Sequence, residues 1–321
     1  MPVPLVEVER SGVVESVHLG DIAVCDASGA LIGSVGDPDR VAFARSCMKP
    51  LQGAVSLASI EGPVSDRDVA VMCSSHNGEP VHVRAVRSLL KRGGLDEEIL
   101  RNPAGRPIDA EAAASVKGSA RIYQDCSGNH AGILVASAYA GWPLDSYRTR
   151  SHPHHRQLLP LIRRLAAADP VIGVDGCGIP VHGMPLRAHA TMYARMAVAA
   201  DDHPALLRVL DAMQAEPYMV GGRERDDTAV MQAVPDLVMK EGAEALHCVL
   251  ARSAGIGVAV KIHDGGYRAA GPATIETLDQ LGLLPPSARR RLGSAWRPTL
   301  RGGDRPAGTI SPIFQLSREQ T

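Results

Sequence analysis

Strand-like segments occur near both ends of this chain, and helix-like segments fill the stretch between them. Short alternating runs bounded by turn residues are typical of strands, and apolar residues that repeat every three or four positions are typical of helices. The expected strands are 12–18, 22–25, 31–35, 171–174, 246–251, 256–262, 267–270 and 309–316. The expected helices are 51–59, 79–92, 131–139, 155–168, two within 187–215, 273–284 and 286–294. We therefore predict an α+β fold of one domain over residues 1–321, with an antiparallel sheet built from both chain ends and flanked by helices.

Composition and charge exclude several classes of protein. Lys and Arg (34) nearly balance Asp and Glu (35), so the net charge is -1 and no strong field draws the chain to nucleic acid or anionic lipid. Aromatic residues make up only 3%, fewer than a base-stacking surface needs. The sequence shows neither a secretory leader nor an apolar run of about 18 residues. Its six cysteines suggest reduced thiols, and we expect a cytoplasmic protein.

The segment Ser46-Cys47-Met48-Lys49 has the spacing of a serine nucleophile and a lysine base. A serine hydroxyl needs a base to remove its proton, and a lysine three positions later on a helix lies on the same face. Ser46 opens an apolar helix as a candidate N-cap, where the helix dipole favours a developing oxyanion. Ser88-Leu89-Leu90-Lys91 has the same spacing inside a charged amphipathic helix, so we interpret Ser88 as an exposed residue. Ser46 and Lys49 are the predicted catalytic residues of an amide hydrolase.

Three other segments carry weaker signals. A lysine base needs a pKa well below about 10.4, which burial or a second cation provides. Lys261 is a candidate for that cation, although a solvent-facing lysine on an edge strand is the simpler interpretation. Ser75 lies beside His76 and offers a second hydroxyl, and a capped loop explains the same residues. Cys126 and His130, four positions apart, fit a metal pair, while buried thiols explain lone cysteines more often.

Taken in order, these segments resemble the thermolabile-type asparaginases, also called class 3 or asparaginase II-like. The motifs that carry the resemblance are 13–16, 44–50, 71–76, 126–130, 175–180, 220–223 and 260–265. The resemblance implies a fold like that of serine β-lactamases and penicillin-binding proteins, hydrolysis of L-asparagine to aspartate and ammonia, and a homodimer. It also implies two Ser–Lys pairs, which by position are Ser46 with Lys49 and Ser75 with Lys261. The second pair would relay protons and lower the pKa of Lys49.

Members of that family bind zinc beside the substrate through Cys, Lys and Cys. The resemblance places these ligands at Cys126, Asn129 and Cys177, so an asparagine stands where the family has lysine. An amide oxygen is a poor zinc ligand. The metal is then lost, weakened, or held with help from His130 or Asp175. Because Ser–Lys chemistry needs no metal, we expect activity to survive with a changed substrate affinity.

Substrate contacts are expected from Arg45, His76, Ser127 and Asp175. A carboxylate suits the ammonium group of an amino acid, and an arginine suits its carboxylate.

Two alternatives remain open. One is a serine amidohydrolase of another small amide, such as glutamine, a β-aspartyl compound or a lactam, since a pocket wall discriminates one methylene by only about 1–3 kcal/mol. The other is a non-catalytic zinc or thiol sensor that uses Cys73, Cys126 and Cys177.

Overall fold

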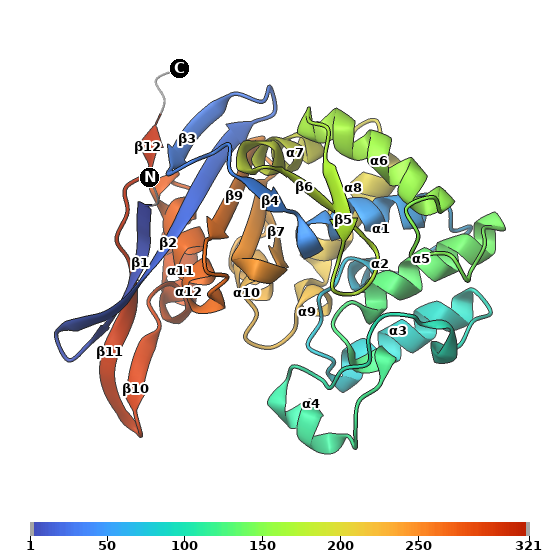
Figure 1. Ribbon diagram of the computed structural model, residues 1–321, viewed down its shortest axis with the longest axis horizontal. Helices are drawn as coiled ribbons and strands as arrows, with labels where there is room; N and C mark the ends of the chain where they lie inside the picture. Colours follow the sequence, from blue (N-terminus) through green and yellow to red (C-terminus); the bar gives the residue numbers. More distant parts are fainter. Residues whose placement is uncertain (1–2, 319–321) are drawn as a thin grey trace.

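The computed structural model describes residues 3–318, and its main sheet joins the two ends of the chain (Figure 1). Seven strands follow the order β10-β11-β1-β2-β9-β8-β7, while β3 pairs with β2 and β12 pairs with β3. The pairings are antiparallel. The strands are β1 (Val3–Arg10), β2 (Val13–Asp26), β3 (Leu31–Val35), β7 (Leu237–Gly242), β8 (Leu246–Ala251), β9 (Ile256–Ile262), β10 (Thr299–Gly302), β11 (Arg305–Pro312) and β12 (Ser317–Arg318). The expected α+β fold with a sheet from both chain ends is confirmed.

Helices cover both faces of this sheet. On one face, Gly257 of β9 lies against α7 (Leu186–Ala199), and a Cβ at Gly257 would fall 1.9 Å from the carbonyl oxygen of Ala190. On the other face, His247 of β8 is paired with Val260 of β9 and bonds to Thr274 of α11 (Tyr267–Gln280). Residues 257 and 260 differ by an odd number of positions, so they point to opposite faces.

Most of the remaining helices form a lobe beside the sheet (Figure 1). Its helices are α1 (Lys49–Ala58), α2 (Asp66–Met72), α3 (Pro80–Arg92), α4 (Ala110–Ser115), α5 (Ser127–Ala140), α6 (Pro153–Ala166), α8 (Pro204–Ala215) and α9 (Pro217–Val220). Two others, α10 (Asp226–Ala233) and α12 (Pro286–Trp296), lie at the main sheet, where α10 packs against β7 and α12 packs against α11. Short 3-10 turns are η1 (Arg45–Met48), η2 (Glu97–Ile99), η3 (Arg121–Tyr123) and η4 (Ala243–Ala245). Within the described part of the chain, no helix combines the length and apolar character that a membrane span requires.

A second, three-stranded sheet lies at the junction of sheet and lobe. It has the order β4-β6-β5, with β4 (Val41–Phe43), β5 (Val171–Val174) and β6 (Pro180–Pro185). Both outer strands run antiparallel to β6, so β4 and β5 are parallel to each other and their carboxyl ends meet at one edge. Each of these strands leads directly into a segment that the sequence analysis singled out, residues 44–50 after β4 and 175–180 after β5.

Several local predictions were wrong. The expected strands 12–18 and 22–25 form the single strand β2, because Gly20 continues the ladder close to the Lys261 carbonyl instead of turning the chain. The expected strand 267–270 is the first turn of α11. Strands β1 and β7 were not expected, the latter because Lys240 and Glu241 interrupt its apolar pattern. Ser46 is not an N-cap, since it lies inside η1, whose own N-cap is Ala44.

Candidate active site

Ser46 lies in the 3-10 turn η1, between β4 and α1, and its side chain is partly exposed. A 3-10 helix repeats every three residues, so Ser46 and Lys49 project from the same side of the turn. The preceding residue, Arg45, has a φ of 46°, a left-handed conformation that costs a non-glycine residue about 1–3 kcal/mol. The structure therefore holds a strained backbone directly before the predicted nucleophile.

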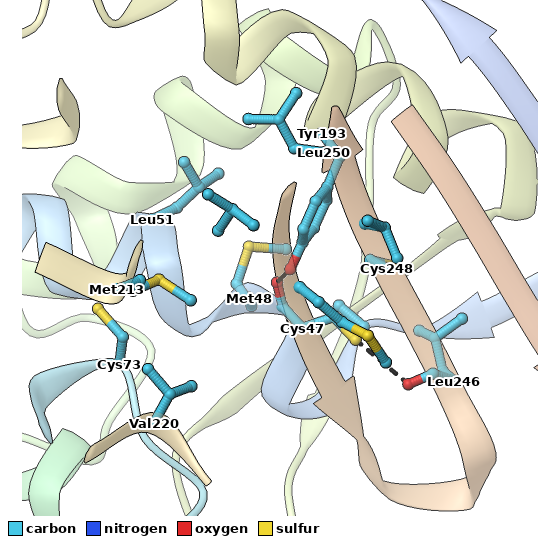
Figure 2. Close-up of a cluster of buried hydrophobic side chains, with 14 of the residues drawn as sticks. Cys47, Met48, Leu51, Cys73, Tyr193, Met213, Val220, Leu246, Cys248 and Leu250 are labelled. Carbon is cyan, nitrogen blue, oxygen red and sulfur yellow. Dashed lines mark hydrogen bonds between the residues drawn. The ribbon is translucent and has the colours of Figure 1, made fainter. Parts of the chain in front are cut away.

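Buried contacts anchor this turn to the main sheet (Figure 2). The Cys47 thiol donates to the carbonyl oxygens of Lys240 at 3.1 Å and Leu246 at 3.3 Å, in β7 and β8. The phenol of Tyr193 in α7 donates to the Cys47 carbonyl at 2.8 Å. Because the residue after Ser46 is fixed to two strands and a helix, the position of the Ser46 hydroxyl is set by the core.

The Lys49 side chain is buried and reaches the loop that carries Ser75. Its ammonium nitrogen lies 2.8 Å from Ser75 Oγ and 2.5 Å from the Ser74 carbonyl oxygen. It also lies 3.2 Å from Cys126 Sγ, at the start of α5. Three predicted site residues, Lys49, Ser75 and Cys126, thus meet in one buried cluster, and Ser75 pairs with Lys49.

The electrostatics of this cluster favour a protonated Lys49. Burial lowers the pKa of Lys49, but the negative charges of Cys126 and Asp125 together raise it by more than burial lowers it. The pKa of Lys49 therefore lies above its ordinary value. The pKa of Cys126 is lowered, chiefly by a hydrogen bond from Cys177 and also by Lys49. The Cys177 thiol is correspondingly held in its neutral form, its pKa raised by that same bond and by burial. Both shifts favour an ammonium on Lys49 beside a thiolate on Cys126.

His76 and Ser127 are fully buried, and their hydrogen bonds are internal. The backbone N–H of Gly78 donates to His76 Nδ1 at 3.0 Å, so the proton of the neutral ring is on Nε2, which donates to Ser127 Oγ at 2.9 Å. Ser127 Oγ in turn donates to the Ile122 carbonyl at 2.9 Å. In the structure these two residues, which were predicted to touch substrate, tie the Ser75 loop to the start of α5.

Arg45 and Asp175 form an ion pair at the shared edge of β4 and β5. Arg45 Nε lies 3.0 Å from Asp175 Oδ2, and the two side chains keep 22% and 15% of their surface exposed. The parallel direction of the two strands brings these residues together although they are 130 positions apart. An accessible cation and an accessible anion therefore stand side by side next to Ser46.

Lys261 makes no hydrogen bond to Ser75, which is bonded to Lys49 instead. Its ammonium donates to the carbonyl oxygens of Glu244, at 2.7 Å, and of Ile262, so it fastens the turn between β7 and β8. Burial lowers its pKa. A different lysine, Lys240 of β7, is fully buried, and its carbonyl oxygen accepts the bond from Cys47. Lys240 was not predicted as a site residue, although a lysine within the apolar run 237–242 was a sequence signal for a buried charge.

A family model for L-asparaginase II matches residues 6–312. The chain belongs to the L-asparaginase II family. This is the family that the ordered motifs of the sequence resemble. No curated protein sequence matches the chain.

Solved structures similar to this L-asparaginase II family protein include two of a protein named Mglu and a β-lactamase from Mycobacterium bovis. The Mglu structures, one crystallised in 4.3 M NaCl, both have 14% identity and cover 83% of this chain, with TM-scores of 0.47 and 0.46. The β-lactamase has 13% identity, a TM-score of 0.34, and 86% and 94% coverage of the two chains. The chain spans 61% and 65% of the Mglu chains. At these scores the likenesses add nothing about activity.

The donor set of this family member does not fit a zinc ion. Only two thiols converge, and in residues 3–318 no three His, Cys, Asp or Glu side chains gather at one point. Asn129 directs its amide nitrogen to the Met72 carbonyl at 3.0 Å. His130 is bound to Tyr147, and Asp175 to Arg45. The Lys49 ammonium, 3.2 Å from Cys126 Sγ, places a positive charge where a cation would bind.

A buried charge network supports the Ser75 loop from the other side. Arg225 donates to Asn77 Oδ1 at 3.2 Å and pairs with Glu241 at 2.8 Å. Lys240 and Asp227, both without any exposed side-chain surface, pair at 2.8 Å. Glu241 also accepts from the Asp227 backbone N–H at 3.0 Å. None of these residues was predicted from the sequence, because their meeting depends on how α10 packs against β7.

The Glu241→Gln substitution is expected to make the free energy of unfolding depend less on pH under acidic conditions. Although burial opposes it, the charges of Arg225, His247 and Lys240 lower the pKa of Glu241 from 4.5 to about 2. A depressed carboxyl pKa stabilises the fold above the unfolded value, and this contribution is lost as pH falls through the folded value. Urea unfolding between about pH 6 and pH 2 measures it. Glu97→Gln, at an exposed pair with Arg87, is the control, and an equal change in both variants would contradict the assignment.

Proposed function

We propose that this protein hydrolyses L-asparagine to L-aspartate and ammonia through an ester intermediate on Ser46. The observation that carries the proposal is the buried Lys49, three residues after Ser46 and hydrogen-bonded to the second hydroxyl, Ser75. Membership of the L-asparaginase II family supports the reaction class. No step of the proposed reaction uses a metal.

The first step is activation of Ser46. Lys49 must first lose one Nζ proton to become a neutral amine, and the negative charge of Cys126, whose Sγ lies 3.2 Å away, opposes this loss because it raises the pKa of Lys49. The amine then takes the proton from Ser46 Oγ as that oxygen attacks the side-chain amide carbon of asparagine. General-base catalysis of this kind contributes about 10²–10⁴ in rate.

The second step releases ammonia. Ser75 Oγ accepts a hydrogen bond from Lys49, so its own proton is free to move to the amide nitrogen as the C–N bond breaks. The proton that Lys49 took from Ser46 then replaces the one lost by Ser75. Lys49 then takes a proton from water as the water attacks the Ser46 ester. As the ester breaks, Lys49 passes this proton to Ser46 Oγ. The sum is asparagine and water to aspartate and ammonia.

The Arg45–Asp175 pair suits an α-amino acid. A zwitterion carries the same two charges, so its carboxylate can bind Arg45 while its ammonium binds Asp175. Both side chains are partly exposed, and they lie beside the residue that attacks. This arrangement favours a free amino acid over a neutral lactam among the alternatives.

The deciding experiment is release of ammonia from L-asparagine and from L-glutamine by the purified protein. We expect a larger kcat/KM for asparagine, with no loss when a chelator is present. Adding hydroxylamine should divert the ester to aspartyl hydroxamate, which reports the intermediate directly. Absence of ammonia from either amide, with and without zinc, overturns the proposal, and activity that chelation removes and zinc restores overturns the metal-free chemistry.

Replacing Cys126 with alanine is expected to shift the pH profile to lower pH. The thiolate raises the pKa of Lys49, and burial alone lowers the pKa of an ammonium group. The rise of kcat/KM with pH reports loss of the Lys49 proton, so this rise should begin at lower pH in Cys126→Ala. Cys25→Ala removes a buried thiol bonded to the Arg187 carbonyl and should leave the profile unchanged. A shift to higher pH in Cys126→Ala would contradict the ion-pair assignment.

A further inference from the structure

His130 and Tyr147 form a buried pair next to the cluster of Lys49, Cys126 and Ser75. Tyr147 Oη lies 2.7 Å from His130 Nδ1, and the rings meet edge to face. The backbone N–H of Arg101 donates to the same phenol oxygen at 2.9 Å. His130 Nε2 is buried and has no hydrogen-bond partner among residues 3–318.

Counting protons fixes the tautomer of His130. Since Arg101 donates to Tyr147 Oη, the phenol proton is free to go to His130 Nδ1, and the neutral ring then carries its own proton on Nε2. The other tautomer would leave two buried groups unpaired, the phenol O–H and the Nε2 lone pair. The first arrangement leaves one, the Nε2–H donor. Tyr147 therefore selects a histidine with an unused N–H.

This unused donor distinguishes His130 from other buried histidines. His82, His155 and His189 each direct Nε2 at a backbone carbonyl oxygen, at distances of 2.8–2.9 Å. Each must donate from Nε2, and its unpaired Nδ1 is an acceptor. A buried donor without an acceptor is rarer and more costly than an under-used acceptor. The His130 N–H is therefore a group that requires an acceptor from outside the described residues.

The position of His130 indicates where that acceptor binds. His130 is four residues after Cys126 in α5, so the two side chains share one face of the helix. Cys126 Sγ is in contact with Lys49, and the charges of Lys49 and Arg148 both act on His130. The pair thus borders the reacting groups on the side of α5.

We propose that Tyr147 is a positioning residue that holds the His130 Nε2–H ready for an oxygen atom of the bound amino acid. The proposal deepens the proposed function and rests on it for the identity of the ligand. The tautomer itself follows from the contacts of Tyr147 alone. Tyr147 has no exposed surface, so it acts only through His130.

The test is imidazole nitrogen NMR of the whole protein, with and without the product L-aspartate. In the free protein we expect His130 as the Nε2–H tautomer, and we expect saturating L-aspartate to move its resonance. In Tyr147→Phe, Nδ1 loses its donor and the signal should show both tautomers, while KM for asparagine rises about tenfold with a smaller change in kcat. The control is Tyr139→Phe. Tyr139 lies on the same helix as His130, α5, and makes a long contact to the Arg92 carbonyl, so this variant should change none of these quantities.

A resonance indifferent to L-aspartate means that the acceptor is water and overturns the proposal, as does an Nδ1–H tautomer in the free protein. If Tyr147→Phe does not fold, the wild-type spectra recorded with and without L-aspartate still test the tautomer and the binding of the acceptor. Failure of asparagine hydrolysis itself is recognised separately, because the wild-type protein would then release no ammonia while the tautomer in the free protein could still be read.

Discussion

Replacing Ser46 with alanine is expected to lower kcat for asparagine hydrolysis by at least about 10⁴, since removal of a serine nucleophile costs about 10⁴–10⁶ in comparable hydrolases. The hydroxyl supplies the bond to the acyl group, and no other residue of η1 carries one. Ser46 is partly exposed and makes none of the contacts that anchor the turn, which belong to Cys47. The thermal stability of Ser46→Ala should therefore match that of the wild type.

The chain offers a matched control in Ser88, which is also followed by lysine at the third position. Ser88 is exposed in α3, so Ser88→Ala should leave kcat and KM unchanged. Hydroxamate formation with hydroxylamine should disappear in Ser46→Ala and persist in Ser88→Ala. Retention of a substantial rate in Ser46→Ala would transfer the role of nucleophile to Ser75, whose hydroxyl is also bonded to Lys49.

The sequence was informative where chemistry is local. Ser46 and Lys49 are three positions apart, and any helical turn places them on one side. The helices over 79–92 and 131–139, and the strands over 246–251 and 256–262, were recognisable because their apolar residues repeat with the helical or strand period. The sheet from both chain ends followed from the positions of these segments along the chain.

The sequence was less informative where chemistry depends on distant packing. Lys261 and Lys240 both lie in apolar strands, and only the strand order shows that Lys261 fastens the β7–β8 turn while β7 lies beside η1. His76 looked available beside Ser75, but its two ring nitrogens are used by Gly78 and Ser127. The Arg45–Asp175 pair depends on two short strands, one of which, β4, the apolar pattern did not reveal.

Breaking the Lys240–Asp227 pair is expected to give the largest loss of stability. The two side chains have no exposed surface and lie 2.8 Å apart. Asp227→Ala leaves a buried ammonium without its anion, which costs about 3–5 kcal/mol in proteins. Urea unfolding at neutral pH measures this change in the free energy of unfolding. The control is Asp169→Ala, which breaks the exposed pair with Arg163 and should cost no more than about 1 kcal/mol.

A double variant separates the structural role of this pair from a role in the site. Replacing both charges by apolar residues of similar size, as in Lys240→Met with Asp227→Leu, removes the buried charge together with its partner and should recover most of the stability. The β7 backbone that accepts from Cys47 would then remain in place, and with it the position of Ser46. Burial raises the pKa of Cys73, two residues before Ser75, to about 12, and the positive charge of Lys240 opposes this rise. A stable double variant that releases ammonia slowly would therefore assign this charge to the site. If the double variant equals the wild type in stability and activity, the pair serves only to hold α10 against β7. If Asp227→Ala is no less stable than Asp169→Ala, the buried pair contributes nothing to stability.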